Sequence, residues 1–277
     1  MHLHLQSFAL STSLICDVRQ PRDNKQNFAI MTNNIKFVAE LSNVTEVSLL
    51  GTANLDYWQK RLSPYGLFPL PSNGTALILV IAAKAHFMRV PFCEVSFSVI
   101  VSPNQDQHSF QDGACLLSAF NSNRFFAFSE RTFFSTPYYP AKCEIGLSPI
   151  KIKLSNRRET LFTAQMGNVE NRETLQLADD GWHGSVAILP PGRNANTPYK
   201  YFIAKINGKT SIYPFEASND TLIVAKDSSH PLFSELAESG FDGKQWIVRP
   251  AANHAKSKTY RSGNLHNSGC SRSGSGA

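Results

Sequence analysis

A lysine that follows a dense aromatic segment is the residue of this sequence best placed for covalent chemistry. Lys142 ends the stretch that begins at Arg131 and holds two phenylalanines, two tyrosines and two prolines. Apolar surroundings lower the proton affinity of an amine, and a neutral amine can attack a carbonyl to form a Schiff base. The alternative is a lysine at the start of a strand, with its ammonium in solvent and its stem along the aromatic side chains.

Other motifs that carry chemistry are missing. The sequence has no phosphate-binding glycine loop, no G-x-G-x-x-G, no H-E-x-x-H and no G-x-S-x-G. The segment from Asp179 to His183 mixes carboxylates with a histidine, which favours an acidic hairpin turn over a metal site. Five cysteines without a C-x-x-C pair indicate neither a zinc site nor a disulfide framework. We therefore predict no metal, no cofactor and a cytoplasmic protein with reduced thiols.

The charge balance argues against a nucleic-acid partner. The 277 residues carry a net charge of +6, but four of these charges belong to residues after 250, where no acid occurs. The body of the chain is close to neutral, so its charge does not predict a basic surface that binds the phosphate backbone of a nucleic acid. No apolar run approaches the ~20 residues of a membrane-spanning helix. We predict no nucleic-acid and no membrane partner, with an interaction module acting through the basic tail as an alternative.

The composition divides the chain into three parts. Residues 1–35 are expected to form a disordered N-terminal extension, with translation from Met31 as an alternative to Met1. Residues 36–250 are expected to form a single domain, because no linker interrupts them. Residues 251–277 are rich in serine and glycine with scattered basic residues, and they predict a disordered tail.

The patterns in the body predict a mainly β protein of the α+β class. Many short strands follow one another, and they include Thr75–Ala83, Phe92–Val101 and a final strand at Gln245–Arg249. Asn207-Gly208 predicts a hairpin turn. Helices are predicted at Leu55–Leu62 with Asn54 as its cap, at Gly113–Phe120 and at Pro231–Ser239. Close spacing of the strands indicates an antiparallel β-barrel, closed or folded over, with a central cavity and a few short helices.

Three motifs in this order resemble the acetoacetate decarboxylase superfamily. They are Glu46-Val47-Ser48-Leu49-Leu50-Gly51, then Val90-Pro91-Phe92-Cys93-Glu94-Val95-Ser96, then the stretch from Phe133 to Lys142. The likeness is to uncharacterised members with a Pro-Tyr-aromatic-x-Ala-Lys signature. It implies a closed barrel-like fold with a central cavity for a small organic acid, often in a homo-oligomer.

The resemblance retains only part of the family's catalytic set. A family glutamate matches Glu94, whereas the Schiff-base lysine falls on Ala141 and the chain has lysine one residue later, at Lys142. A shift of one residue along a strand turns a side chain to the other face. The family's second acid would fall near Leu79 and its arginine near Gly51, where neither residue type occurs.

Two functions are compatible with these residues. The first is lyase-type Schiff-base chemistry on a small carbonyl compound or keto acid, with Lys142 as the amine and Glu94 as the proton-transfer group. The second is non-catalytic binding of a small molecule in the barrel. In both, the ligand would contact a set of mostly aromatic residues, namely Phe92, Arg124, Phe134, Tyr138 and Tyr139. Arg124 has the alternative role of a surface ion-pair residue.

Overall fold

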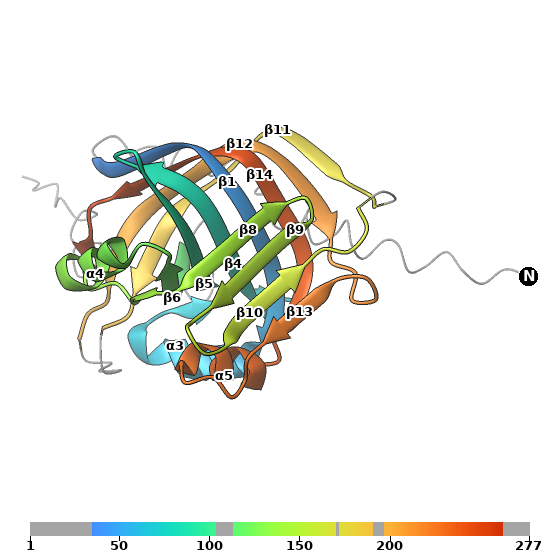
Figure 1. The fold of residues 1–277 in the computed structure, drawn as a ribbon. Helices are drawn as coiled ribbons and strands as arrows, with labels where there is room; N and C mark the ends of the chain where they lie inside the picture. The colour runs from blue at the N-terminus through green and yellow to red at the C-terminus, as the bar shows by residue number, and fades with distance from the viewer. Residues whose placement is uncertain (1–34, 104–112, 170–171, 191–196, 263–277) are drawn as a thin grey trace, which may run out of the picture.

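Seven long strands form a ring in the computed structural model, which describes residues 35–103, 113–169, 172–190 and 197–262 (Figure 1). In ring order they are β5 (Val90–Ser102), β4 (Thr75–Phe87), β1 (Phe37–Asn54), β14 (Asp242–Ser257), β12 (Lys200–Pro214), β11 (Leu175–Ile188) and β6 (Gly113–Asn121). Pairing of β6 with β5 closes the ring, and only the β6–β11 contact in it is parallel. The predicted mainly β, closed arrangement is confirmed.

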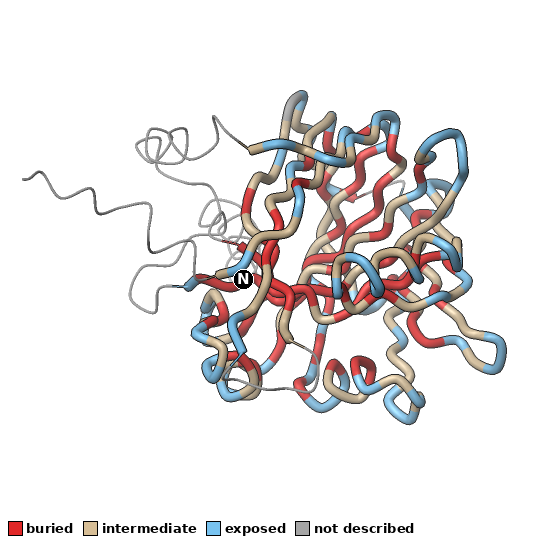
Figure 2. Tube along the Cα trace, turned by 90° about the vertical axis from the view of Figure 1, so that its left-hand side faces the viewer, coloured by how far each residue is buried: buried red, intermediate tan, exposed pale blue. Residues whose placement is uncertain are grey.

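A second, four-stranded sheet covers the outer face of the ring. It contains β13 (Thr221–Val224), β10 (Thr160–Gln165), β9 (Ile150–Ser155) and β8 (Lys142–Leu147), and α5 (Pro231–Glu238) packs beside it (Figure 1). The main hydrophobic core lies between these layers, as in the contacts of Phe97 with Phe162 and Phe233 at 5.2 and 5.7 Å between ring centroids. Figure 2 shows the buried residues concentrated along these strands.

The two faces of the ring strands differ in burial and polarity. On β4, Ile78 and Val80 point to the outer core and are fully buried, whereas Leu79 and Ile81 on the inner face keep partial exposure. The alternation of side chains along a strand produces this difference. Polar residues also gather on the inner face: Glu46, Ser48, Glu94, Ser96 and Ser98. The inner face therefore combines polar groups with apolar side chains that keep partial exposure.

Short elements complete the chain. Helix α3 (Leu55–Leu62) begins as predicted, because the side chain of Asn54 accepts a hydrogen bond of 2.8 Å from the backbone N–H of Tyr57. The remaining elements are η2 (Ser63–Tyr65), β2 (Phe68–Pro69), β3 (Pro71–Ser72), α4 (Arg124–Phe133), β7 (Tyr138–Pro140) and β15 (Tyr260–Arg261). No helix among the described residues is long and apolar enough to cross a membrane.

Three local predictions are wrong. Gly113–Phe120 is strand β6, because pairing with β5 and β11 overrides its helical spacing of leucines. The expected turns at Asn207-Gly208 and at Asp179–His183 lie inside the long strands β12 and β11, where the register shifts. Their glycines serve close packing instead: a Cβ on Gly181 would overlap the carbonyl oxygen of Ile206, and one on Gly208 would crowd Ala252.

The expected boundary at residue 250 also differs from the structure. Strand β14 continues to Ser257 and β15 adds Tyr260–Arg261, so the first residues of the expected tail belong to the ring. Antiparallel pairing with both β1 and β12 satisfies their backbone groups. The expected N-terminal extension at 1–34 and residues 263–277 lie outside the described residues.

Candidate active site

A carboxyl group on the inner face of the ring is the centre of the candidate site. Glu94 on β5 accepts a hydrogen bond of 2.9 Å from the hydroxyl of Tyr138 and one of 3.1 Å from the side-chain amide of Asn121. The residue keeps partial exposure although protein atoms surround it closely. Burial raises the pKa of Glu94, the carboxylate of Glu130 raises it further, and the opposing hydrogen bonds and Lys256 do not compensate. A carboxyl group with a raised pKa holds its proton to higher pH than an ordinary glutamate, which suits it to act as a general acid.

Next to this carboxyl, a lysine lies in a partly buried aromatic setting. The ammonium of Lys256 on β14 lies 2.7 and 2.8 Å from the two oxygens of Glu130. It also lies between 4.8 and 5.7 Å from the centroids of three rings, those of Phe134, Tyr138 and Phe202. The side chains of both charged residues are about one-fifth exposed, at 20% and 22%. Amine, carboxylate and aromatic rings are thus assembled beside Glu94.

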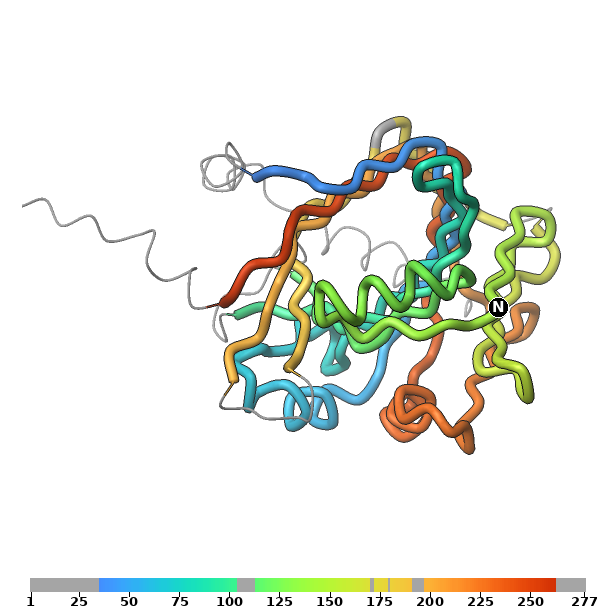
Figure 3. Tube along the Cα trace, turned by 60° about the vertical axis from the view of Figure 1, so that its left-hand side comes forward, coloured from blue at the N-terminus to red at the C-terminus, as the bar shows by residue number. Residues whose placement is uncertain are grey.

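Helix α4 positions the carboxylate partner of this lysine. The helix begins after Asn123, whose side chain accepts hydrogen bonds from the first backbone N–H groups. Ala127 is fully buried toward the ring, and Glu130, one turn later, lies on the same side of the helix. The hydroxyl of Thr136 donates a hydrogen bond of 3.0 Å to Glu130. In Figure 3, α4 lies beneath the arch of β12 and β14, which brings Glu130 to Lys256.

A second polar network lies on the inner face of the ring. Glu46 on β1 lies 2.6 Å from a guanidinium nitrogen of Arg249 and 2.7 Å from Nε2 of His254. Burial opposes ionisation of Glu46, but the contacts with His254 and Arg249 outweigh it and lower its pKa. Arg249 also donates to Thr210 and Asp180 at 2.9 and 3.0 Å. Each charge here has a partner, so the network ties four strands together.

Lys142, the amine proposed from the sequence, lies outside this constellation. Its side chain is 73% exposed, and its ammonium lies 3.0 Å from the carboxylate of Glu144. The next residue, Cys143, points into the core. Strand alternation therefore places Lys142 toward solvent, which is the alternative stated for it above.

The two tyrosines of the predicted site point in different directions. Tyr138 reaches Glu94 through its hydroxyl, and Phe134 joins it beside Lys256. Tyr139 packs on the outer side, with its ring centroid 4.5 Å from that of His230. One half of the predicted aromatic lining therefore belongs to the site.

The other predicted binding residues lie nearer the rim. Phe92 packs edge-on against Phe126 with 5.5 Å between ring centroids, and Arg124 is exposed at the first position of α4. The positions that the resemblance gives for the missing arginine and acid hold Gly51 and Leu79, neither of which is charged. A Cβ on Gly51 would overlap the carbonyl oxygen of Asp242 and the ring of Phe241, so no arginine fits there.

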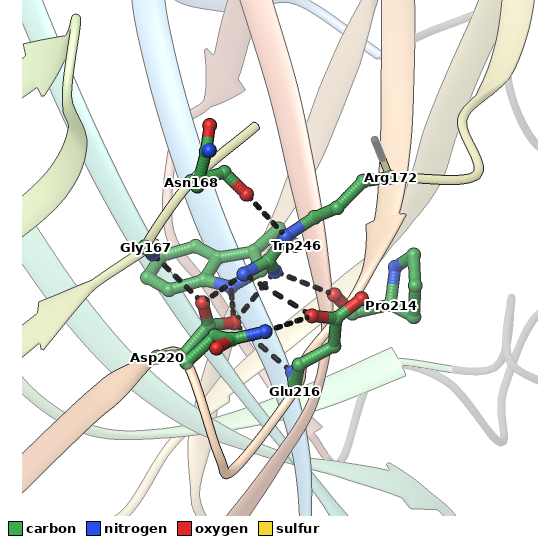
Figure 4. Close-up of polar contacts among 8 residues, drawn as sticks. Gly167, Asn168, Arg172, Pro214, Glu216, Asp220 and Trp246 are labelled. Atoms are coloured by element: carbon green, nitrogen blue, oxygen red, sulfur yellow. Dashed lines mark hydrogen bonds and ion pairs between the residues drawn. The ribbon is translucent and has the colours of Figure 1, made fainter. Parts of the chain in front are cut away.

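A buried ion pair on the other side of the ring wall is another cluster of charged residues that could form a functional site (Figure 4). Arg172 binds both carboxylate oxygens of Asp220, which also accept hydrogen bonds from the Trp246 indole and from the backbone N–H groups of Gly167 and Glu216. Burial opposes ionisation of Asp220, but these hydrogen bonds, led by that of Arg172, lower its pKa. Every lone pair direction is occupied, so the cluster holds loops together rather than reacting.

A hollow of about 410 Å³ adjoins this ion pair. Its wall is about equally polar and apolar and comes from residues around β13 and the end of α5, including Phe215, Leu222, Val224 and Asp242. Asp220 is shared with the ion pair and has no free oxygen position for a ligand. In the described part of the chain, no group of three or more His, Cys, Asp and Glu side chains is arranged to hold a metal ion.

Sequence reasoning missed Lys256 and Glu130. The composition places Lys256 in the expected tail, and Glu130 lies in an aromatic stretch for which the sequence predicts neither the helix α4 nor a site residue. A usable signal was present, because no glycine occurs between Lys244 and Ser262 and the Ser/Gly-rich composition begins only at Gly263. Reading the tail from that point would have left Lys256 inside the last strand.

Comparisons with known proteins identify the fold. The chain matches no family model and no curated protein sequence. Its structure is similar to acetoacetate decarboxylase from Legionella pneumophila, with a TM-score of 0.53, 11% identity and coverage of 83% of this chain and 89% of that one. It is also similar to the enduracididine biosynthesis enzyme MppR, solved with the condensation product of pyruvate and imidazole 4-carboxaldehyde, with a TM-score of 0.53, 10% identity and coverage of 80% and 88%.

A third solved structure, of an acetoacetate decarboxylase, aligns with a TM-score of 0.50 and 12% identity over 81% of this chain and 90% of that one. All three comparisons span most of both chains, and all three identities lie far below the level at which function transfers with the fold. The ring of seven strands with its covering sheet is the fold of acetoacetate decarboxylase.

Proposed function

We propose that the protein binds a small carbonyl compound or organic acid on the inner face of the ring and carries out lyase-type Schiff-base chemistry there. Lys256 is the amine of this proposal and Glu94 is the proton-transfer group. The observation that carries it is the placement of the Lys256 ammonium between the Glu130 carboxylate and three aromatic rings, beside a carboxyl whose pKa is raised.

The Glu130–Lys256 pair can prepare the amine. Transfer of one proton from the ammonium of Lys256 to Glu130 leaves a neutral amine, which adds to the carbonyl carbon of the substrate. The adduct moves one proton from its nitrogen to the former carbonyl oxygen, which becomes a hydroxyl. Glu94 protonates this hydroxyl, the carbon–oxygen bond breaks to release water as the carbon–nitrogen double bond forms, and Glu130 then returns a proton to Glu94. Ammonium and carbonyl thus become iminium and one water, with no net gain or loss of protons.

Tyr138 has a positioning role. Its hydroxyl donates to Glu94, and its ring lies 5.7 Å from the Lys256 ammonium. Burial raises the pKa of Tyr138 well above its ordinary range, and the carboxyls of Glu94 and Glu130 add to this, so the phenol remains a donor. The tyrosine therefore holds acid and amine in one geometry.

The solved structures support the substrate class of this proposal. The MppR structure holds a condensation product of a keto acid and an aldehyde, and the other two neighbours are acetoacetate decarboxylases. Carbonyl compounds and keto acids are thus the ligands named for proteins of this fold. Because these proteins are only 10–12% identical to this chain, the roles of Lys256 and Glu94 are argued from their own contacts.

Borohydride trapping tests the proposal. The full chain is incubated with small aldehydes, ketones and keto acids, reduced with sodium borohydride, and analysed by intact mass and peptide mapping. We expect a reduced adduct on Lys256, its loss in Lys256→Met, and its retention in the matched control Lys142→Met. An adduct on Lys142 would instead support the lysine proposed from the sequence, and the assignment of Lys256 would be abandoned.

Non-catalytic binding is the second candidate, and the three aromatic rings around Lys256 favour it. A ligand that raises the melting temperature equally in wild type, Glu94→Gln and Lys256→Met, without any adduct after reduction, would select this function. Circular dichroism of each variant verifies that the chain is folded.

A further inference from the structure

We propose that the Lys256 site selects neutral aldehydes and ketones with an apolar substituent and discriminates against keto acids, because its cations are already neutralised by carboxylates of the protein. This inference rests on the proposed function, in that Lys256 must form the imine. The inference goes beyond the proposed function by naming the charge of the substrate.

Each basic side chain that β14 brings to the inner face already has an acidic partner. Arg249 contacts Glu46 and Asp180 at 2.6 and 3.0 Å, and His254 shares Glu46 at 2.7 Å. Lys256 is paired with Glu130 at 2.7 Å. A substrate carboxylate would have to displace one of these partners to gain a cation.

Imine formation with a neutral carbonyl preserves this balance. The positive iminium nitrogen replaces the positive ammonium opposite Glu130, so the pair remains intact. A keto acid adds one negative charge to the same partly buried space, near Glu130 and close to Glu94. An unpaired carboxylate in such a place carries a desolvation penalty that its attraction to an already paired lysine does not offset.

Aromatic side chains account for the preference for an apolar substituent. The rings of Phe134, Tyr138 and Phe202 surround the Lys256 ammonium, and Phe202 belongs to an apolar cluster with Leu116 and Val186. An apolar substituent on the carbonyl carbon can bury its surface against these rings, whereas a carboxylate cannot.

Matched pairs of compounds test the inference. Phenylacetaldehyde and phenylpyruvate, and isobutyraldehyde and 3-methyl-2-oxobutanoate, differ only by a hydrogen in place of the carboxylate. Rates of adduct formation under cyanoborohydride are measured for the full chain and for N-acetyl-lysine methyl ester, and the ratio on the ester corrects for intrinsic reactivity. We expect the corrected preference for the aldehyde to be about tenfold or more in both pairs.

Glu130→Gln provides the decisive variant. It removes the negative charge opposite Lys256 and leaves the ammonium without its carboxylate, so the corrected preference should fall toward unity or reverse in favour of the keto acid. Ser129→Gln, at the preceding position of α4, is the matched control and should retain the wild-type ratio.

The outcomes separate this inference from the proposed function. Adducts on Lys256 that form equally well, or better, with the keto acids after correction would overturn the charge selection and leave the Schiff-base proposal standing. No adduct on Lys256 with any compound would overturn both. An unchanged ratio in Glu130→Gln would show that Glu130 does not set the selection and would also reject the inference.

Discussion

Two carboxyl groups on opposite sides of the ring wall lie in opposite electrostatic situations. Asp220, on the outer side of the ring wall, accepts five hydrogen bonds, two of them from Arg172, and its pKa is lowered. Glu94, on the inner face, accepts two, and its pKa is raised. Burial opposes ionisation of both groups, so the number and charge of the donors decide the outcome.

The difference separates a structural carboxylate from one suited to chemistry. Asp220 is ionised and saturated with donors, which leaves no position for a ligand. Glu94 has a neutral amide and a phenol as donors and a carboxylate nearby, so its pKa is raised and it holds a proton more readily than an ordinary glutamate. Burial of an acid is therefore a poor guide to function until its partners are counted.

The largest expected effect is on folding, at Asp220. Asp220→Asn removes the charge opposite Arg172, whose side chain is only 2% exposed. Removing one partner of a buried ion pair lowers the free energy of unfolding by about 3–5 kcal/mol. Urea denaturation followed by tryptophan fluorescence measures it. The double variant Asp220→Asn with Arg172→Met should recover part of the loss; a loss below 1 kcal/mol in the single variant would contradict the structural role.

Glu94→Gln should instead impair chemistry and leave folding nearly unchanged. Glutamine keeps an oxygen for the Tyr138 hydroxyl but has no proton to transfer. The rate of adduct formation on Lys256 should fall about 10²-fold, with a change in unfolding free energy within about 1 kcal/mol. Single-turnover trapping and urea denaturation give the two values. A destabilisation as large as that of Asp220→Asn would show that Glu94 has a structural role like that of Asp220.

The pH dependence of stability should have opposite signs at the two acids. The lowered pKa of Asp220 means that its contribution is present above the ordinary aspartate pKa and is lost as pH falls through the folded-state value. The raised pKa of Glu94 means that its contribution is present below the ordinary glutamate pKa and is lost as pH rises through the folded-state value. Melting temperatures between pH 3 and 8 for wild type and the two variants give the difference curves; slopes of the same sign would refute the comparison.

The smallest effect is expected at Lys142. Its contact with Glu144 is an exposed ion pair, which contributes about 0–1 kcal/mol. Lys142→Ala should therefore leave both the unfolding free energy and the trapping rate on Lys256 within error of wild type. A strong loss of adduct would show that the exposed amine takes part after all.

Local signals predicted several elements and one half of the site. The cap at Asn54, the helix from Leu55 and the buried run of β4 follow from side chains that interact with near neighbours in the chain. Glu94 and Tyr138 were named from a motif and an aromatic segment, and they meet in the structure at 2.9 Å. Gly113–Phe120 failed because strand pairing on both edges decided its conformation.

The sequence by itself determined the β-rich class and the helices that begin at Leu55 and Pro231, because these depend on local hydrogen bonds and alternation. The acid of the site, Glu94, came from the resemblance of its motif to a family. Only the tertiary structure decided which lysine faces that acid. Lys142 has the stronger local signal, because it follows the aromatic segment, yet its side chain is 73% exposed, whereas that of Lys256 is 20% exposed. The closure of the ring brings β14 over α4 and joins Lys256 to Glu130, 126 residues earlier in the chain. Strand register and ring closure are properties of the whole chain, and they set the burial and the partners of every charge in the site.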